Sequence, residues 1–149
     1  MNETLTYLYS TGGTRRYHNR PELDQNTGKH SWGVAMIIAV LHPNPSPNLL
    51  KACLYHDCAE KVYGDLLSPM KNDFPEAKEL DRKCNEKFWN DLKDIDFPEL
   101  TEEEALWLEY ADVYECCLFT QGKDEFVYTY SLEKSRIIWN KLEELGFSK

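Results

Sequence analysis

The sequence has no long hydrophobic run. Its longest apolar run, residues 34–41, is eight residues long, whereas a helix that crosses a bilayer needs about 20 apolar residues. We therefore expect no membrane partner and interpret this run as the middle of a buried helix. The first ten residues also lack a basic stretch followed by an apolar one, which is the pattern of a secretion signal. A cytoplasmic location is expected.

Cysteine pairs at the spacing of metal or redox motifs are also missing. The five cysteines occur at positions 53, 58, 84, 116 and 117, and no two of them form a C-x-x-C pair. This excludes the usual sequence patterns of zinc ribbons and thioredoxin-like sites. We expect reduced thiols that fill the core rather than act as nucleophiles.

Basic residues are scarce. The chain has 17 Lys and Arg against 26 Asp and Glu, and its formal net charge is −9. The average surface therefore repels nucleic acid and anionic membranes, and neither is expected as a partner. An anionic substrate would have to be bound by local cations or by a metal ion.

Strand signals are few, and the rest of the sequence has a helical pattern. The expected helices cover residues 30–41, 49–63, 75–93, 101–122 and 131–145, while residues 126–130 have strand-like composition that we interpret as a loop or the start of a helix. A chain of 149 residues with 42% hydrophobic content suits one domain, residues 1–149. The predicted fold class is all-α, a single bundle of five to six helices. We expect Trp32 in its core and His42 exposed.

One predicted helix carries polar residues on its apolar face. Positions 49, 50, 53 and 54 mark this face, and His56, Asp57 and Glu60 occupy its next turn. Buried carboxylates need a partner because their desolvation is costly. His30, at the start of the central helix, and Asp112, on the core stripe of the fourth helix, are the candidates. Two His and two Asp residues from three helices predict a divalent metal site, and such ligands suit Mn²⁺, Co²⁺, Zn²⁺ or Fe²⁺.

Three segments together resemble the HD-domain metal-dependent phosphohydrolases. They are KHSWGVA at residues 29–35, YHDCAEKVYGDLLSPMK at 55–71 and ADVYE at 111–115. The resemblance implies an HD-domain helical bundle with metal ligands His30, His56, Asp57 and Asp112. It also implies that Glu60, together with Asp57, is catalytic and that Glu60 orients or deprotonates the attacking water.

The resemblance also implies substrate contacts. Asp65 matches the family's contact to the sugar hydroxyl, and Lys71 matches a phosphate ligand. An arginine before the first histidine of the motif matches Arg15 or Arg16, and the spacing leaves both open. His18 is a further candidate for substrate binding. A local basic rim on an acidic protein is expected from Arg15, Arg16, His18, Arg20 and Lys71.

The closest groups within the family act on deoxynucleotides. They are the phage dATP triphosphohydrolases, which the run RRYH…HSWGVA resembles somewhat more, and the bacterial HD-domain 5′-deoxynucleotidases. We expect hydrolysis at the α-phosphate of a 2′-deoxynucleotide, in the host cytoplasm if the chain is phage-encoded. The substrate is a dNTP, with dATP preferred, or alternatively a dNMP. A nucleotide-binding regulatory module with a structural metal is the alternative from another class, and the presence of Glu60 argues against it.

The expected cofactor is one divalent transition metal, Co²⁺, Mn²⁺ or Zn²⁺, which a second ion could accompany at the substrate phosphates. These ligands discriminate poorly among first-row ions. A homo-oligomer is also expected, because a 17.5 kDa chain with 13% aromatic residues could bury some of that surface between subunits, and because related enzymes are oligomers.

Overall fold

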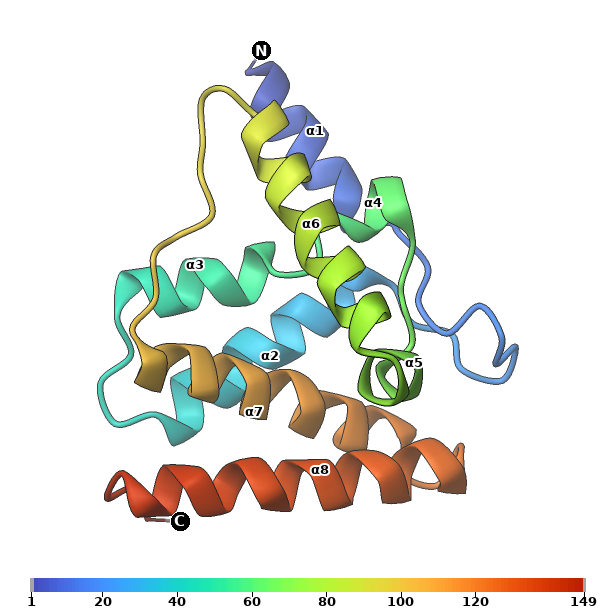
Figure 1. Cartoon of the computed structure of the whole chain (residues 1–149), viewed down its shortest axis with the longest axis vertical. Helices are drawn as coiled ribbons and strands as arrows, with labels where there is room; N and C mark the ends of the chain where they lie inside the picture. Colours follow the sequence, from blue (N-terminus) through green and yellow to red (C-terminus); the bar gives the residue numbers. More distant parts are fainter. Residues whose placement is uncertain (1, 149) are drawn as a thin grey trace.

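The computed structural model describes residues 2–148, and the helices within this range confirm the all-α prediction (Figure 1). The described helices are α1 (Glu3–Thr11), α2 (Thr27–Leu41), α3 (Pro47–Tyr55), α4 (Glu60–Tyr63), α5 (Ser68–Asp73), α6 (Pro75–Asp91), α7 (Glu102–Thr120) and α8 (Glu125–Glu144). The described residues form no strand beyond an isolated antiparallel bridge between Arg15 and Asn26. None of the described helices combines the length and hydrophobicity that crossing a bilayer requires.

Four helices form the main core. Helices α7 and α8 run antiparallel along one side of the molecule, α2 packs across α7, and α3 packs on α2 (Figure 1). Trp107 of α7 and Leu142 of α8 are almost completely buried between these helices, together with Ile38 of α2 and Leu49 of α3. Burial of such large apolar side chains supplies most of the driving force for folding.

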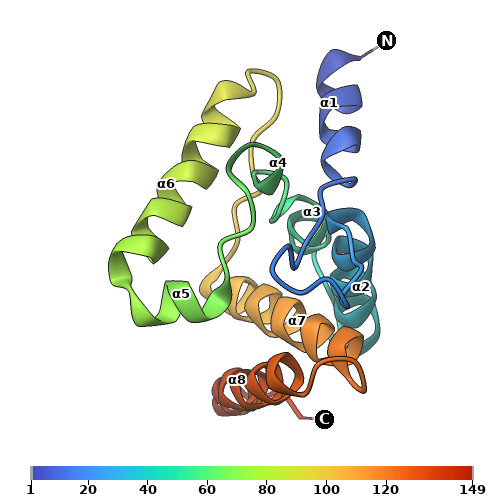
Figure 2. The same ribbon diagram turned by 90° about the vertical axis from the view of Figure 1, so that its right-hand side faces the viewer.

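Helix α6 is held by a second, smaller apolar cluster. Figure 2 shows α6 and α5 set off from the main bundle, on the opposite side from α2. Phe88 and Trp89 of α6 are buried against Cys58 and Ala59, and Tyr7 of α1 stacks on Phe88 with ring centroids 6.1 Å apart. Helix α6 therefore packs both on α1 and on the short segment between α3 and α4.

The described residues form more helices than the five or six expected. The sequence pattern did not predict α1, α4 and α5 as separate short helices. The helix expected over residues 49–63 is interrupted after Tyr55, so that His56 caps α3 and a tight turn leads to α4 at Glu60. Helices α1 and α5 were not expected at all. Residues 126–130 belong to α8, which starts early because the Asp124 side chain accepts a hydrogen bond from the Val127 amide.

Two expectations about single side chains were wrong. Trp32 is 63% exposed on α2, because α2 is apolar nearly all round and its periodicity does not show which face is buried. His42 is not exposed as expected. Its side chain packs edge-on against Trp107, with ring centroids 4.9 Å apart, and also contacts Phe147. Its Nδ1 accepts a hydrogen bond from the Asn44 amide at 3.1 Å.

Candidate metal centre

The structure brings the four predicted metal ligands together from three elements. His30 Nε2 lies 3.2 Å from His56 Nε2, 3.4 Å from Asp57 Oδ2 and 2.9 Å from Asp112 Oδ1. His56 Nε2 lies 3.3 Å from the same Asp57 oxygen and 3.9 Å from the Asp112 oxygen. His30 belongs to α2 and Asp112 to α7, whereas the interruption after α3 turns His56 and Asp57 toward both.

The hydrogen bonds of both imidazole rings leave Nε2 as the atom that can bind a metal. His56 Nδ1 lies 2.9 Å from the Cys53 carbonyl oxygen, which can only accept, so Nδ1 donates. His30 Nδ1 lies 2.5 Å from Glu115 Oε2 and donates to that carboxylate. In each neutral ring the lone pair is then on Nε2. The two lone pairs point into a space that Asp57 and Asp112 also face.

Such a donor set fits a divalent cation. Ligand bonds of about 2.0–2.1 Å place the donor atoms around one ion roughly 3 Å from each other, and His30 Nε2 has the other three candidates at 2.9–3.4 Å. The set contains imidazole and carboxylate groups, as Mn²⁺, Co²⁺ and Zn²⁺ accept. Cys116 Sγ also lies within 4.8 Å of donor atoms of His30 and Asp112, on the pocket side of α7.

The charges of the cluster shift its pKa values in the direction expected for a cation site. Burial raises the pKa of Asp112, but the hydrogen bond and charge of His30 bring it down to about 2. Burial also raises the pKa of Asp57, yet the charges of His56 and Arg16 hold it well below the usual range. Burial and Arg16 lower the pKa of His30, whereas hydrogen bonds to Asp112 and Glu115 raise it to about 9. Without a metal ion His30 therefore carries a second proton, on Nε2, which a bound ion would replace.

Arg16 and Glu60 lie beside this cluster. The Arg16 guanidinium donates from Nη1 to Asp57 Oδ2 and lies 3.5 Å from Glu60 Oε1. Burial and the Asp57 charge raise the pKa of Glu60 to about 9. Arg16 Nε and Glu60 Oε2 are buried and have no hydrogen-bond partner among the described protein atoms. Both residues line the adjoining pocket.

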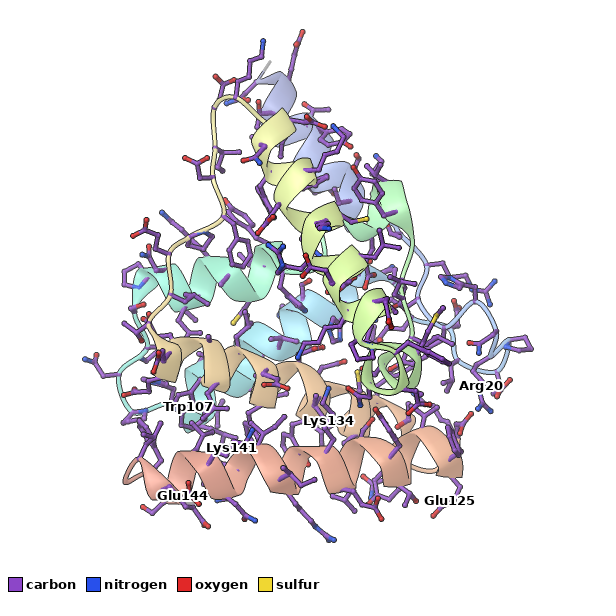
Figure 3. The ribbon with its side chains drawn as sticks, viewed as in Figure 1. Arg20, Trp107, Glu125, Lys134, Lys141 and Glu144 are labelled. Carbon is purple, nitrogen blue, oxygen red and sulfur yellow. The ribbon has the colours of Figure 1, made fainter. Side chains whose placement is uncertain are left out.

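The pocket next to the cluster contains cations and aromatic rings. Its floor includes Asp57, Glu60 and Asp112, and its cationic residues are Arg16, Arg20, Lys71 and Lys134. Phe126 and Tyr130 contribute aromatic walls from the first turns of α8. Figure 3 shows Lys134 on the side of α8 that faces α7, and Arg20 on the loop after α1. The geometry therefore places local positive charge beside the acidic cluster.

The predicted substrate contacts divide into two groups. Arg16, Asp65 and Lys71 line the pocket, whereas Arg15 and His18 do not. Arg15 is exposed and its backbone forms the bridge with Asn26. His18 is also exposed, with its Nε2 3.3 Å from the Asp65 carbonyl oxygen. Of the two arginines that the spacing left open, the geometry places Arg16 in the site.

Several residues of this site were missed in the sequence. Lys134, Phe126 and Tyr130 line the pocket but belong to α8, which carries no part of the motif. Arg20, which was expected in the basic rim, also lines the pocket. Glu115, which contacts His30, follows Asp112 by three residues and so shares its helix face. That spacing was the signal that could have identified it.

Comparison with known proteins identifies the family. The chain matches the family model described as an HD domain over residues 13–146. No curated protein sequence matches the chain. The matched range includes all four candidate ligands and covers most of the chain, so the chain belongs to the HD-domain family of metal-dependent phosphohydrolases.

Proposed function

We propose that this protein hydrolyses 2′-deoxynucleotides at the α-phosphate, with dATP as the preferred substrate and tripolyphosphate as the released product. The observation that supports it most is the convergence of His30, His56, Asp57 and Asp112 beside Arg16, at a pocket whose lining includes four cationic side chains. A pocket with both a metal-binding quartet and positive charge suits a phosphorylated substrate.

The residues divide the chemistry between them. The quartet would hold a divalent ion, which would lower the pKa of a water and polarise a phosphoryl oxygen. Arg16 lines the pocket beside the quartet, where its guanidinium would donate to a phosphoryl oxygen that gains charge in the transition state. The charge of such an ion would lower the pKa of Glu60 from about 9, and its carboxylate would then hold the attacking water and accept its proton. The water oxygen forms a bond to the α-phosphorus, the bond to the 5′-oxygen breaks, and a proton is delivered to the leaving nucleoside.

The preference for a deoxynucleotide rests on sequence resemblance. Asp65 matches the family's contact to the sugar hydroxyl, and it lines the pocket. The segment from Arg15 to Ala35, with its RRYH and HSWGVA runs, resembles the phage dATP triphosphohydrolases. Adenine preference follows from this resemblance alone.

The number of phosphates on the substrate depends on whether three pocket cations bind phosphate groups or stay paired with carboxylates of the protein. Arg20, Lys71 and Lys134 line the pocket in addition to Arg16, and a triphosphate offers enough negative charge to engage them all. Each of the three also has a carboxylate neighbour, Asp124 at 3.0 Å, Asp81 at 3.3 Å and Glu109 at 4.0 Å respectively. This second observation favours the alternative, a 5′-deoxynucleotidase for dNMPs, because the cations are then already neutralised.

A product assay tests the proposal. Purified protein is incubated with Mn²⁺ or Co²⁺ and a panel of dNTPs and dNMPs, and phosphorus NMR identifies the products. Deoxyadenosine and intact tripolyphosphate from dATP would support the triphosphohydrolase. Phosphate from several dNMPs, with dNTPs intact, would replace it by the nucleotidase. Absence of turnover with every substrate and metal would contradict both and favour a binding module.

A further inference from the structure

Glu115 of α7 connects a metal-ligand candidate to two other elements. Its Oε2 lies 2.5 Å from His30 Nδ1, and its Oε1 accepts a hydrogen bond from Gln25 Nε2 at 2.8 Å. All three side chains are buried, with exposed fractions of 7% for Glu115, 2% for Gln25 and 0% for His30. Because both carboxylate oxygens are engaged from different directions, the carboxylate has little freedom to rotate.

A glycine provides the space that this carboxylate occupies. Gly33 lies in the interior of α2, where glycine weakens a helix. A Cβ added at Gly33 would lie 2.7 Å from Glu115 Cγ and 3.0 Å from Glu115 Oε1, closer than atoms pack. Any larger residue at position 33 would therefore displace the Glu115 side chain and change its contact with His30.

We propose that Glu115 is a positioning residue of the metal centre, and that Gln25 and Gly33 hold it in place. Glu115 keeps the His30 proton on Nδ1 and fixes the ring so that Nε2 faces His56, Asp57 and Asp112. It also increases the basicity of Nε2, as carboxylates behind metal-binding histidines do. Glu115 does not touch the reacting atoms and acts through His30. The inference rests on the proposed metal-dependent function and deepens it.

Direct Co²⁺ binding separates this role from a purely structural one. Co²⁺ affinity and the visible absorption of bound Co²⁺ are measured for Glu115→Ala, Glu115→Gln and Gly33→Ala. The melting temperature of each is measured in chelator. Glu133→Gln, at an exposed position on α8, is the matched control. We expect Glu115→Ala to weaken Co²⁺ binding by about 10–100-fold, and Glu115→Gln to weaken it less because the amide oxygen still accepts from Nδ1.

Gly33→Ala is the most informative variant. It keeps every polar group of the site and places a better helix former in α2, so a loss of Co²⁺ affinity or a changed Co²⁺ spectrum would come from the displaced carboxylate. If Glu115→Ala fails to fold, Gly33→Ala and Glu115→Gln still test whether Glu115 positions His30 for metal binding. Wild-type Co²⁺ affinity and spectrum in all three, with only the melting temperatures changed, would overturn the proposal.

The binding measurement needs no turnover, so its failure is distinguishable from failure of the proposed activity. Wild-type protein that binds Co²⁺ but hydrolyses no nucleotide would contradict the proposed function, while the ranking of the variants would still decide the role of Glu115. Wild-type protein that binds no Co²⁺ would overturn both.

Discussion

The Arg16 guanidinium donates a hydrogen bond to the same Asp57 oxygen, Oδ2, that faces both imidazole rings of the candidate metal centre. A metal ion and Arg16 would therefore share the charge of one carboxylate. Arg16 is 6% exposed and reaches this position from the loop between α1 and α2, which is also one wall of the pocket. Arg16 thus lies between the candidate metal ligands and the pocket.

Arg16→Ala should lower turnover by about 10²–10³-fold, the usual loss when a donor to a transition-state oxygen is removed. Metal affinity should be kept or increased, because Asp57 no longer shares its charge with a guanidinium. Steady-state kinetics and Co²⁺ titration measure the two effects separately. Arg15→Ala, at the exposed neighbouring position, is the control and should retain wild-type turnover. Equal losses in the two variants would contradict the placement of Arg16 in the site.

Glu60→Gln should abolish most activity and leave the metal in place. Glu60 does not belong to the quartet, and the substitution keeps its size while removing the group that accepts the proton. The expected loss of turnover is about 10²–10⁴-fold, the range for a general base. Turnover and bound-metal content are measured on the same preparation. A rate within a few-fold of wild type would leave Glu60 outside the chemistry.

Asp57→Asn should remove metal and activity together and keep the helical fold. The amide oxygen can still accept from Arg16, so the buried guanidinium keeps a partner and the large penalty of an unpaired buried charge is avoided. The lost negative charge weakens the site for any divalent ion. Metal analysis after dialysis and far-ultraviolet circular dichroism test both parts. Asp57→Asn protein with full metal content and full turnover would refute the ligand assignment.

Local sequence signals predicted the ends of α6 and α7 to within two residues, but neither end of α1 or α5. The capping box of Thr101 and Glu104 is present at the start of α7, and Gly64, with φ of 81°, ends α4 as expected. These features depend on residues three or four positions apart, so they can be predicted from the sequence alone. At the interruption after His56, by contrast, Cys58 and Ala59 pack under α6. This contact joins residues that are far apart in the sequence, so local patterns do not predict it.

Only some residues of the candidate site could be predicted, because the others are brought together by contacts between distant parts of the sequence. Asp57, Glu60 and Asp65 lie within one short motif, so resemblance could find them. Lys134 comes from α8, whose relation to the motif is set by the antiparallel packing of α7 and α8. The choice between Arg15 and Arg16 depended on the path of an irregular loop, where neither helical nor strand periodicity applies.

The metal-free protein should become less stable as pH rises from about 6.5 to 9. The pKa of His30 is raised from 6.5 to about 9, since its hydrogen bonds to Asp112 and Glu115 outweigh burial and the charge of Arg16. A group whose pKa is higher in the folded state contributes stability below its unfolded value and loses it as pH approaches the folded value. Glu60, whose pKa is raised from 4.5 to about 9 by burial and Asp57, acts in the same direction.

Melting temperatures between pH 6.5 and 8.5, measured in chelator and in excess Mn²⁺, test this dependence. The chelated protein should melt at lower temperature as pH rises. Stabilisation by Mn²⁺ should grow over the same range, because the ion replaces the proton on His30 and binding releases that proton. A melting temperature of the chelated protein that is constant or rises with pH would show that His30 does not hold this proton. Stabilisation by Mn²⁺ that is independent of pH would show that the ion does not displace it.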